Sequence, residues 1–314
     1  MSDLIRRALP VYGLAEDTPL TLLNRSENET WRAGPLVLRL HREGYHSKPE
    51  IASELAWLTA LQDLPGLNTT RPIPGAQGLV TELDGRHLVA FSPIAGQELQ
   101  PGDDLARWFA PLGEITARLH VHARAWTPPP SFTRKRWDLE TILGPRPHWG
   151  HWRQAEGLNP QGEALLARAT DMLATRLAAY GTGTKVFGLI HADLRLANLM
   201  VDGDRLTVID FDDCGFGWWA YDLAAALSFI ETDPRLPDLI AAWVDGYTRI
   251  APLTKEDRAM IPSLIFLRRV LLTAWLSTRA DSDTAQSLGG PAYARGTLDL
   301  AERYLTDGLL AFLP

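Results

Sequence analysis

The N-terminal third of the chain combines short strand-like runs with one helical pattern. Two apolar runs, at residues 30–33 and 36–40, are joined by the turn residues Gly34 and Pro35 and predict a pair of strands. Apolar residues then recur at helical spacing, at Ile51, Leu55, Leu58 and Leu61. A second hairpin is expected to turn at Asp84–Gly85. The predicted order is therefore strand, strand, helix, strand, strand.

Amphipathic helices dominate the rest of the chain. Gly181 stands where the C-cap of one of them is expected, and the helical patterns occupy residues 104–126, 162–181, 237–250, 255–277 and 293–312. The Pro-rich, basic stretch 127–137 is expected to be an exposed connector within this helical region. The most natural boundary lies near residues 92–97, so we expect one domain at 1–95 and a second at 96–314.

Composition narrows the class of protein. With 46% hydrophobic and 22% charged residues, the 314-residue chain resembles soluble globular proteins. Its formal net charge of −7 argues against nucleic acid or an anionic membrane as the main partner. The single cysteine, Cys214, cannot form an intrachain disulfide, which fits a reducing compartment. The N-terminus lacks the apolar core of a signal peptide, and no run approaches the roughly 18 apolar residues that span a bilayer. We expect a cytoplasmic protein.

The segment 189–210, LIHADLRLANLMVDGDRLTVID, carries the most specific chemical pattern. It places His191, Asp193 and Asn198 in one loop between apolar strands, and Asp210 follows at the end of the second strand. This is the H-x-D-x-x-x-x-N and D-F-x spacing of a phosphoryl-transfer site. An ordinary hairpin with polar turn residues is the alternative interpretation, but the flanking strands and the D-F-D sequence favour the functional one.

Phosphoryl transfer depends on positioning and charge neutralisation, and each residue of the pattern suits one part of it. Asp193 is the candidate that orients the acceptor hydroxyl and receives its proton. Asn198 and Asp210 supply oxygen ligands of the kind that Mg²⁺ prefers. His191 is expected to hold the loop by hydrogen bonds, and Arg195 is close enough in sequence to reach the transferred phosphoryl group.

At this point a family resemblance is clear. IHADLRLANLM followed by VIDFDDCGFGWWAYDLA resembles the aminoglycoside phosphotransferase superfamily, which includes bacterial type II homoserine kinases, choline kinases and stress-response kinases. The resemblance implies an α+β, bilobal, protein-kinase-like fold. Its N-lobe is small, with an antiparallel sheet and one main helix, and its C-lobe is larger and mostly helical. It also implies ATP and Mg²⁺ between the lobes, Asp193 as the catalytic residue, and Asn198 and Asp210 as metal ligands. Asp222 is implied to support the catalytic loop, with a simple helix N-cap as the alternative.

The N-terminal region departs from the family pattern at two positions. The loop expected to cover the phosphates contains no glycine, so Ser26, Asn28 and neighbouring amides would have to contact phosphate; a polar turn is the alternative. Arg39 stands where the family has a phosphate-binding lysine, and the two side chains are not equivalent. Glu54 on the next helix is the expected ion-pair partner of Arg39, with Glu50 one turn earlier as a rival.

The adenine and acceptor subsites are less well specified. The resemblance implies that the backbone between Phe91 and Ile94 hydrogen-bonds the adenine edge. Asp212, Asp213 and Trp218 suit a cationic acceptor through ion pairing and cation–π contact. The alternatives are that Asp212 takes a second metal position and that the tryptophan packs under the following helix.

Three functions remain open from the sequence. The leading one is ATP- and Mg²⁺-dependent transfer of the γ-phosphoryl group to a hydroxyl of a small amino alcohol, amino acid or aminoglycoside-like molecule. A stress-response-type Ser/Thr protein kinase is the second, and a non-catalytic nucleotide-binding protein is the third. Because DFDDCGFGWWAYDLA leads directly into a helix, no long activation segment is present, and this favours a small-molecule substrate.

Overall fold

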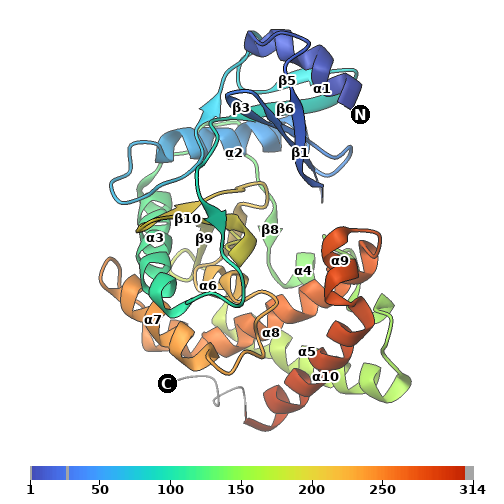
Figure 1. The fold of residues 1–314 in the computed structure, drawn as a ribbon. Coiled ribbons are helices and arrows are strands. Elements are labelled where there is room, and N and C mark those ends of the chain that lie inside the picture. The colour runs from blue at the N-terminus through green and yellow to red at the C-terminus, as the bar shows by residue number, and fades with distance from the viewer. Residues whose placement is uncertain (1, 26–27, 308–314) are drawn as a thin grey trace. The chain divides into compact units, whose positions relative to one another are not determined.

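The computed structural model describes residues 2–25 and 28–307, which form two compact units (Figure 1). Unit 1 comprises Met1–Gln97, Thr127–Arg134 and Met200–Asp212. Unit 2 comprises Glu98–Trp126, Lys135–Leu199 and Asp213–Pro314. Helices and antiparallel sheets occur in the same chain, which confirms the α+β class. A domain boundary between residues 95 and 96 stays a prediction.

Unit 1 is built on a six-stranded antiparallel sheet. The strand order is β1-β2-β3-β6-β4, and β5 also pairs with β6. The strands are β1 (Leu20–Arg25), β2 (Glu29–Ala33), β3 (Leu36–Leu40), β4 (Pro72–Ile73), β5 (Thr81–Leu83) and β6 (Arg86–Phe91). Both predicted hairpins are confirmed. The second one turns at Asp84 and Gly85, whose φ angles of 51° and 73° are both left-handed.

Helix α2 (Lys48–Leu61) is the main helix of unit 1. Ser47 and Glu50 form a reciprocal capping box at its N-terminus, which satisfies amide groups that have no partner within the helix. The apolar positions that predicted this helix are all buried, namely Ile51, Leu55, Leu58 and Leu61. Two further N-terminal elements, α1 (Ser2–Ala8) and η1 (Leu9–Tyr12), bring Ile5 and Leu9 into the same core as the sheet residues.

Residues 200–212 belong to unit 1 although they lie far along the chain. They contain most of β10 (Leu199–Asp202) and all of β11 (Arg205–Val208), in a three-stranded sheet of order β11-β10-β7 with β7 at Gln97–Glu98. The backbone of Val208 donates to the carbonyl of Asn68 at 3.0 Å, and the ring of Phe211 packs edge-on against Trp57. These contacts place Asp210 in the same unit as α2 and the large sheet.

The first part of the basic connector, Thr127–Arg134, belongs to unit 1, so its predicted place within the helical region was wrong. Residues 127–131 are exposed, but Arg134 is buried. Its guanidinium donates to the backbone carbonyls of Glu50 and Asp212. Those carbonyls supply the hydrogen bonds that a buried arginine needs, so the side chain is held inside unit 1 rather than in solvent.

Unit 2 is mostly helical, as the apolar periodicity predicted. Its helices are α3 (Ala106–Ala125), α4 (Leu139–Ile142), α5 (Pro160–Tyr180), α6 (Tyr221–Ala226), α7 (Leu236–Thr248), α8 (Lys255–Thr278), α9 (Asp283–Leu288) and α10 (Gly290–Asp307). Two short 3₁₀ turns accompany them, η2 (Trp152–Gln154) and η3 (Leu196–Asn198). Glycines let α3 and α7 cross closely, because a Cβ on Gly113 would lie 2.1 Å from the Trp243 carbonyl oxygen, and one on Gly246 would lie 1.9 Å from that of Ala110.

A small sheet in unit 2 leads into the predicted site. Its central strand β12 (Gly215–Trp218) pairs antiparallel with β9 (Phe187–Ile190) and parallel with β8 (Arg136–Trp137). The loop bearing His191 and Asp193 begins at the end of β9. The sheet therefore fixes the start of this loop.

Helix α8 is the core helix of unit 2. Within residues 2–25 and 28–307 it alone is long and apolar enough to cross a membrane, but 89% of its most apolar stretch is buried inside the protein. That burial is typical of the central helix of a globular domain. The same helix carries two buried arginines, Arg268 and Arg269.

Candidate active site

The loop after β9 is held in an unusual backbone conformation. Ala192 has a φ of 67°, which costs a non-glycine residue roughly 1–2 kcal/mol. The carboxylate of Asp222 in α6 accepts hydrogen bonds from the backbone amides of His191 at 3.1 Å and Ala192 at 2.7 Å. Asp222 lies inside the helix, whose N-cap is Ala220. It therefore supports the loop, as the family resemblance implied, and is not an N-cap.

A buried polar chain orients Asp222 in turn. His120 on α3 contacts the Asp222 carboxylate through Nε2 at 3.0 Å and the Tyr247 hydroxyl through Nδ1 at 3.0 Å. Burial lowers the pKa of His120 despite the nearby carboxylate, so the ring is neutral. A neutral ring donates from Nε2 to Asp222 and accepts the hydroxyl proton of Tyr247 at Nδ1. Sequence reasoning missed His120 and Tyr247, because they lie 102 and 127 residues from their partners.

The carboxylate of Asp193 is surrounded by hydrogen-bond donors. Its carboxylate pairs with Arg268 of α8 and accepts from the Asn198 side-chain amide at 2.8 Å. Arg195 Nε lies 3.4 Å from the same carboxylate. Burial raises the pKa of Asp193, but the charges of Arg268 and Arg195 outweigh it and hold the pKa below its usual value. Asp193 is thus an oriented, ionised carboxylate.

The other two predicted loop residues also contact Asp193. His191 is buried, and its Nδ1 accepts the backbone N–H of Asp193 at 3.2 Å, so it holds the loop as expected. Asn198 directs its amide nitrogen to the carbonyl and the carboxylate of Asp193, both at 2.8 Å. Within the described residues its Oδ1 accepts no hydrogen bond. That oxygen is therefore available to a cation.

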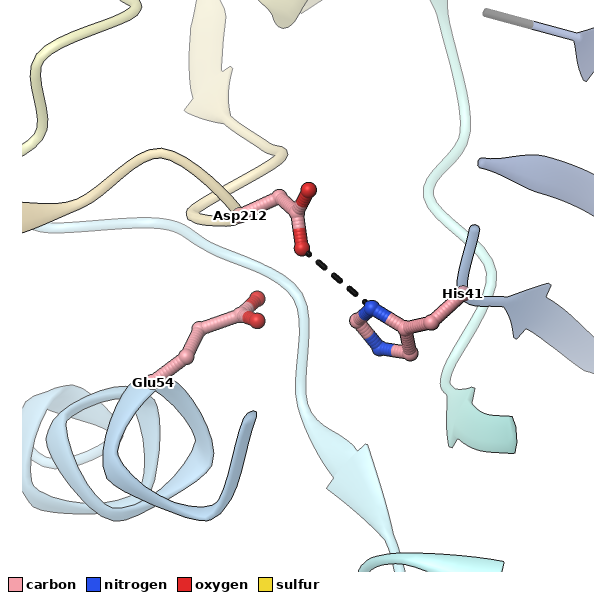
Figure 2. A group of neighbouring side chains, drawn as sticks. All are labelled: His41, Glu54 and Asp212. Atoms are coloured by element: carbon pink, nitrogen blue, oxygen red, sulfur yellow. Dashed lines mark ion pairs between the residues drawn. The ribbon is translucent and has the colours of Figure 1, made fainter. Parts of the chain in front are cut away.

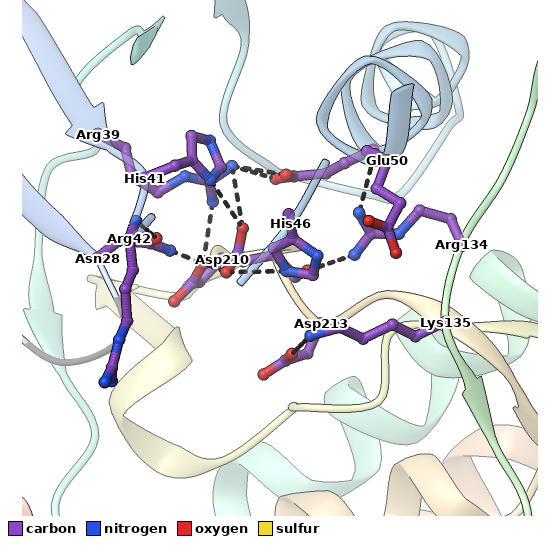
Figure 3. Close-up of polar contacts among 12 residues, drawn as sticks. Asn28, Arg39, His41, Arg42, His46, Glu50, Arg134, Lys135, Asp210 and Asp213 are labelled. Atoms are coloured by element: carbon purple, nitrogen blue, oxygen red, sulfur yellow. Dashed lines mark hydrogen bonds and ion pairs between the residues drawn. The ribbon is translucent and has the colours of Figure 1, made fainter. Parts of the chain in front are cut away.

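In unit 1, Arg39 of β3 joins three carboxylates (Figure 3). Its Nη2 contacts both oxygens of Glu54 at 2.7 and 2.6 Å, and its Nη1 donates to Asp210 at 3.1 Å. The Asp212 carboxylate is 3.7 Å from Nη2. Burial lowers the pKa of Arg39, but the three carboxylates outweigh it and raise the pKa above its usual value. The structure confirms Glu54, and not Glu50, as the ion-pair partner.

Because Glu54 and Arg39 are both buried, their pairing should dominate local stability. We expect Glu54→Gln to lower the free energy of unfolding by about 3–5 kcal/mol, since it leaves a buried guanidinium undercompensated. Glu50→Gln is the matched control on the same helix, because glutamine also serves in a capping box and should cost less than about 1 kcal/mol. Urea unfolding of both variants measures the difference. Equal losses would contradict the special place of Glu54.

Asp210 follows β11 and also has left-handed backbone, with a φ of 62°. Its side chain is 40% exposed, whereas that of its ion-pair partner Arg39 is 6% exposed. The positive φ turns the chain after the strand, and the carboxylate remains accessible on one side. Asp210 is thus a partly exposed acid next to a buried cation, which suits a site that binds a metal ion together with an anion.

Asp212 occupies a buried basic environment. His41 Nδ1 and His46 Nε2 lie 3.5 and 3.3 Å from its carboxylate, and the Asn28 amide donates to it at 2.8 Å. Burial raises the pKa of Asp212, but Arg39 and the neighbouring imidazoles hold it well below its usual value. Burial and the charge on Arg39 hold the pKa of His41 well below its usual value, so His41 is neutral. A role for Asp212 in binding an acceptor stays a prediction.

The group His41, Glu54 and Asp212 has the residue types of a metal site, with ligand atoms within 4.8 Å of one another (Figure 2). Arg39 decides against that function. Its guanidinium already occupies both oxygens of Glu54 and lies 3.7 Å from Asp212. A metal ion bound there would have to displace or repel a buried positive charge. The group is better described as a buried ion-pair cluster centred on Arg39.

The remaining residues predicted to bind the nucleotide are Ser26, Asn28, Phe91 and Ile94, and the last three differ in how far their polar groups are already engaged. Ser26 lies outside the described residues. Asn28 is buried, and its amide group is engaged by Asp212 and by the backbone N–H of Arg42 at 3.0 Å. Phe91 ends β6 and is paired within the sheet. Within the described residues, no hydrogen bond forms to the backbone of Ile94. Ile94 therefore has a backbone donor and acceptor to offer.

Two of the three proposed acceptor residues lie in unit 2. Asp213 has a side chain that is 12% exposed, and one of its carboxylate oxygens is 4.0 Å from Lys135 Nζ. Trp218 is buried against Phe187, and its indole N–H donates to the Gly181 carbonyl at 2.7 Å. Trp218 thus has a packing role in this structure, and its contact with an acceptor stays a prediction.

Comparison with known proteins identifies the family. A sequence model described as the phosphotransferase enzyme family matches residues 22–256, three quarters of the chain and all of the predicted site residues. The chain belongs to this phosphotransferase family. The motif-based resemblance and the kinase-like fold that it implied are thereby confirmed, and the protein is a phosphotransferase of the kind that acts on small-molecule hydroxyls.

Three relatives illustrate the range within the family. A solved structure of a microcompartment-associated aminopropanol kinase is 43% identical, with a TM-score of 0.88 and 98% of each chain covered. Amicoumacin kinase of Bacillus subtilis (strain 168) is 24% identical over 302 residues, which cover 90% of this phosphotransferase and 86% of that protein. The amicoumacin kinase hAmiN, solved in complex with AMP-PNP, Ca²⁺ and Ami, is 21% identical, with a TM-score of 0.75, and the match covers 94% of this chain and 92% of that one. This last likeness supports the fold alone.

Proposed function

We propose that this phosphotransferase moves the γ-phosphoryl group of ATP to the hydroxyl of a short amino alcohol. The observation that carries the proposal is the 43% identity to an aminopropanol kinase across 98% of both chains. Much lower identities separate this chain from the amicoumacin kinases. The ionised Asp193, held at the end of β9, supplies the group that such a reaction requires.

Asp193 is the proposed catalytic residue. One carboxylate oxygen is held by Arg268 and the other by Asn198, so the carboxylate has a fixed orientation. A hydroxyl placed against it donates its proton as the oxygen attacks phosphorus. Arg195, whose Nε lies near the same carboxylate, is proposed to contact the transferred phosphoryl group.

Asn198 and Asp210 are the proposed Mg²⁺ ligands. Their donor atoms fit, because Asn198 has an amide oxygen without a hydrogen bond within the described residues and Asp210 has an accessible carboxylate. When bound, Mg²⁺ neutralises charge that develops on the phosphate oxygens. Arg39 pairs with Glu54 through Nη2, and the other side of its guanidinium is proposed to contact phosphate.

The nucleotide and acceptor subsites complete the proposal. Phe91 and Ile94 are proposed to border the adenine, with the backbone of Ile94 as donor and acceptor. The acidic pair Asp212 and Asp213 and the nearby Trp218 remain the proposed source of ammonium recognition. Of these, Asp213 is favoured, because Asp212 is already surrounded by basic side chains. A cytoplasmic location also remains a proposal.

A panel of acceptors tests the proposed function. ADP release would be measured with 1-amino-2-propanol, ethanolamine, homoserine, choline, an aminoglycoside and a generic protein substrate. We expect 1-amino-2-propanol to give the highest kcat/KM. Propane-1,2-diol is the matched control, because it keeps the hydroxyl and replaces the amine, and we expect it to be a poor acceptor.

Each contrary outcome of the panel points to a defined alternative. Preferred phosphorylation of the protein substrate would favour a stress-response-type kinase. If the protein binds nucleotide but releases no ADP with any of the acceptors, a non-catalytic protein would be favoured. Equal turnover of propane-1,2-diol and 1-amino-2-propanol would remove the ammonium subsite from the proposal.

A further inference from the structure

Arg268 is a buried arginine whose contacts converge on the catalytic loop. It lies in the middle of α8, 75 residues from Asp193 in sequence, and its side chain is 1% exposed. One guanidinium nitrogen, Nη2, pairs with Asp193 Oδ1, and another, Nη1, donates to the backbone carbonyl of Ala192 at 3.3 Å. A single side chain from the core helix thus contacts both the carboxylate and the strained backbone beside it.

The backbone N–H and the backbone carbonyl of Ala192 are both hydrogen-bonded to side chains. Asp222 accepts its N–H at 2.7 Å, and Arg268 donates to its carbonyl. The left-handed conformation of Ala192 is unfavourable for a residue with a Cβ, so it persists only where surrounding contacts impose it. Arg268 is one of the two side chains that impose it.

Arg268 is itself fixed in place. Its Nε donates to the hydroxyl of Ser228 at 2.9 Å, and that hydroxyl donates to the carbonyl of Ala225 at 2.7 Å. Its guanidinium lies over the rings of Trp149 and Tyr221, with centroids at 5.2 and 5.9 Å. Stacking and the directed hydrogen bond leave the guanidinium little freedom, which suits a group that orients another.

The neighbouring Arg269 shows that a buried arginine on α8 need not serve the loop. It pairs with Glu231 at 2.9 Å and donates to Thr297 and to the carbonyl of Tyr293. Within residues 2–25 and 28–307, none of the hydrogen bonds or ion pairs of Arg269 reaches residues 191–198. The two arginines are adjacent in sequence and both buried, yet of these two only Arg268 contacts Asp193 in the described part of the chain.

We propose that Arg268 is a positioning residue for phosphoryl transfer, which holds the Asp193 carboxylate and the Ala192 backbone in the orientation that receives the acceptor hydroxyl. The proposal rests on the proposed function. In this proposal a residue of α8, outside the H-x-D-x-x-x-x-N motif, helps to orient the catalytic carboxylate. The hydrogen bonds of Arg268 go to Ala192, Asp193, Tyr221 and Ser228, none of which is proposed to contact the nucleotide. Loss of Arg268 should therefore lower kcat and leave the KM for ATP unchanged.

The experiment compares Arg268→Lys and Arg268→Ala with Arg269→Ala in steady-state ADP release. We expect Arg268→Ala to lower kcat by about 10²-fold, the cost of misplacing a reacting group, and Arg268→Lys to lower it less. Added guanidinium chloride, below denaturing concentration, should restore part of the activity of Arg268→Ala but not that of Arg269→Ala. The folded fraction of each variant would be measured by circular dichroism, and kcat would be calculated per folded molecule.

Ser228→Ala keeps the charge of Arg268 and removes only the hydrogen bond to Nε, so it covers the case in which Arg268→Ala fails to fold. We expect a smaller fall in kcat with an unchanged KM for ATP. If Arg268→Ala and Ser228→Ala turn over like the wild type, or if Arg269→Ala loses as much kcat as Arg268→Ala, Arg268 has no positioning role. A wild-type protein that turns over no acceptor would instead contradict the proposed function itself.

Discussion

Asp193→Asn is expected to lower kcat by about 10²–10⁴-fold while the affinity for ATP stays unchanged. Asparagine has the size of aspartate but cannot accept the hydroxyl proton as the acceptor attacks. It also leaves the buried Arg268 without its carboxylate partner, so the loop should be less well ordered. Nucleotide affinity should persist, because Arg39, Phe91 and Ile94, the residues proposed to contact the phosphates and the adenine, are unchanged in this variant.

Steady-state ADP release gives kcat for this variant, and calorimetric titration with a non-hydrolysable ATP analogue gives nucleotide affinity. Asp171→Asn is the matched control, since Asp171 is an exposed aspartate on α5 of the same unit. It should behave like the wild type in both measurements. Unchanged turnover in Asp193→Asn would remove Asp193 from the catalytic role.

Asp210→Asn should affect the binding of the metal and the phosphates rather than the acceptor hydroxyl. We expect kcat/KM to fall by about 10²–10³-fold, the cost of removing one group that stabilises charge at the phosphates. The Mg²⁺ dependence of nucleotide affinity should also disappear, because an amide is a weaker ligand than a carboxylate. Loss of the 3.1 Å pair with Arg39 should matter little to stability, since Glu54 still neutralises that arginine.

Titration of a non-hydrolysable ATP analogue with and without Mg²⁺ separates these effects. Asp202→Asn is the control, because Asp202 is an exposed aspartate in β10 of the same unit. In the wild type and in this control, Mg²⁺ should strengthen binding. If Asp210→Asn still responds to Mg²⁺ like the wild type, another residue holds the metal.

Much of the fold was predictable because its signals are local. The two hairpins, β2–β3 and β5–β6, follow from apolar runs separated by short turns in which Gly34, Asp84 and Gly85 have positive φ. Helix α2 follows from its apolar spacing, and its start follows from the capping box at Ser47 and Glu50. That capping box is also the signal that separates Glu50 from Glu54, because a glutamate that caps the helix N-terminus cannot also reach into the core.

The predicted motif residues were found for the same reason. His191, Asp193 and Asn198 lie within eight residues of one another, so their spacing is preserved in sequence. Their hydrogen bonds to one another confirm that the loop folds back on itself. The shared metal of Asn198 and Asp210 stays a prediction, because the two residues belong to different units.

Long-range partners of charged residues could not be predicted. Arg134 and Arg268 are buried, although arginine is usually exposed, and each is satisfied by groups far away in sequence. No pattern around Arg134 distinguishes it from its exposed neighbour Arg136. Burial of a charge depends on partners that only the folded chain brings together.

The arginine that replaces the expected lysine has a geometric rationale. Arg39 uses Nη2 for Glu54 and Nη1 for Asp210, so one planar group joins the helix α2 to the segment after β11. A lysine ammonium is a point charge and lacks this fork. The substitution thus fits the extended cluster of carboxylates around it, which also includes Asp212.

The most direct test of the central claim is to identify the product by ³¹P NMR. Wild-type protein would be incubated with ATP, Mg²⁺ and 1-amino-2-propanol, with the impaired variant Asp193→Asn as the control. We predict a new phosphomonoester resonance that grows in step with ADP and that grows far more slowly with propane-1,2-diol or with the variant. ADP accompanied only by inorganic phosphate, or no ADP above background, would contradict the assignment of this phosphotransferase as an amino alcohol kinase.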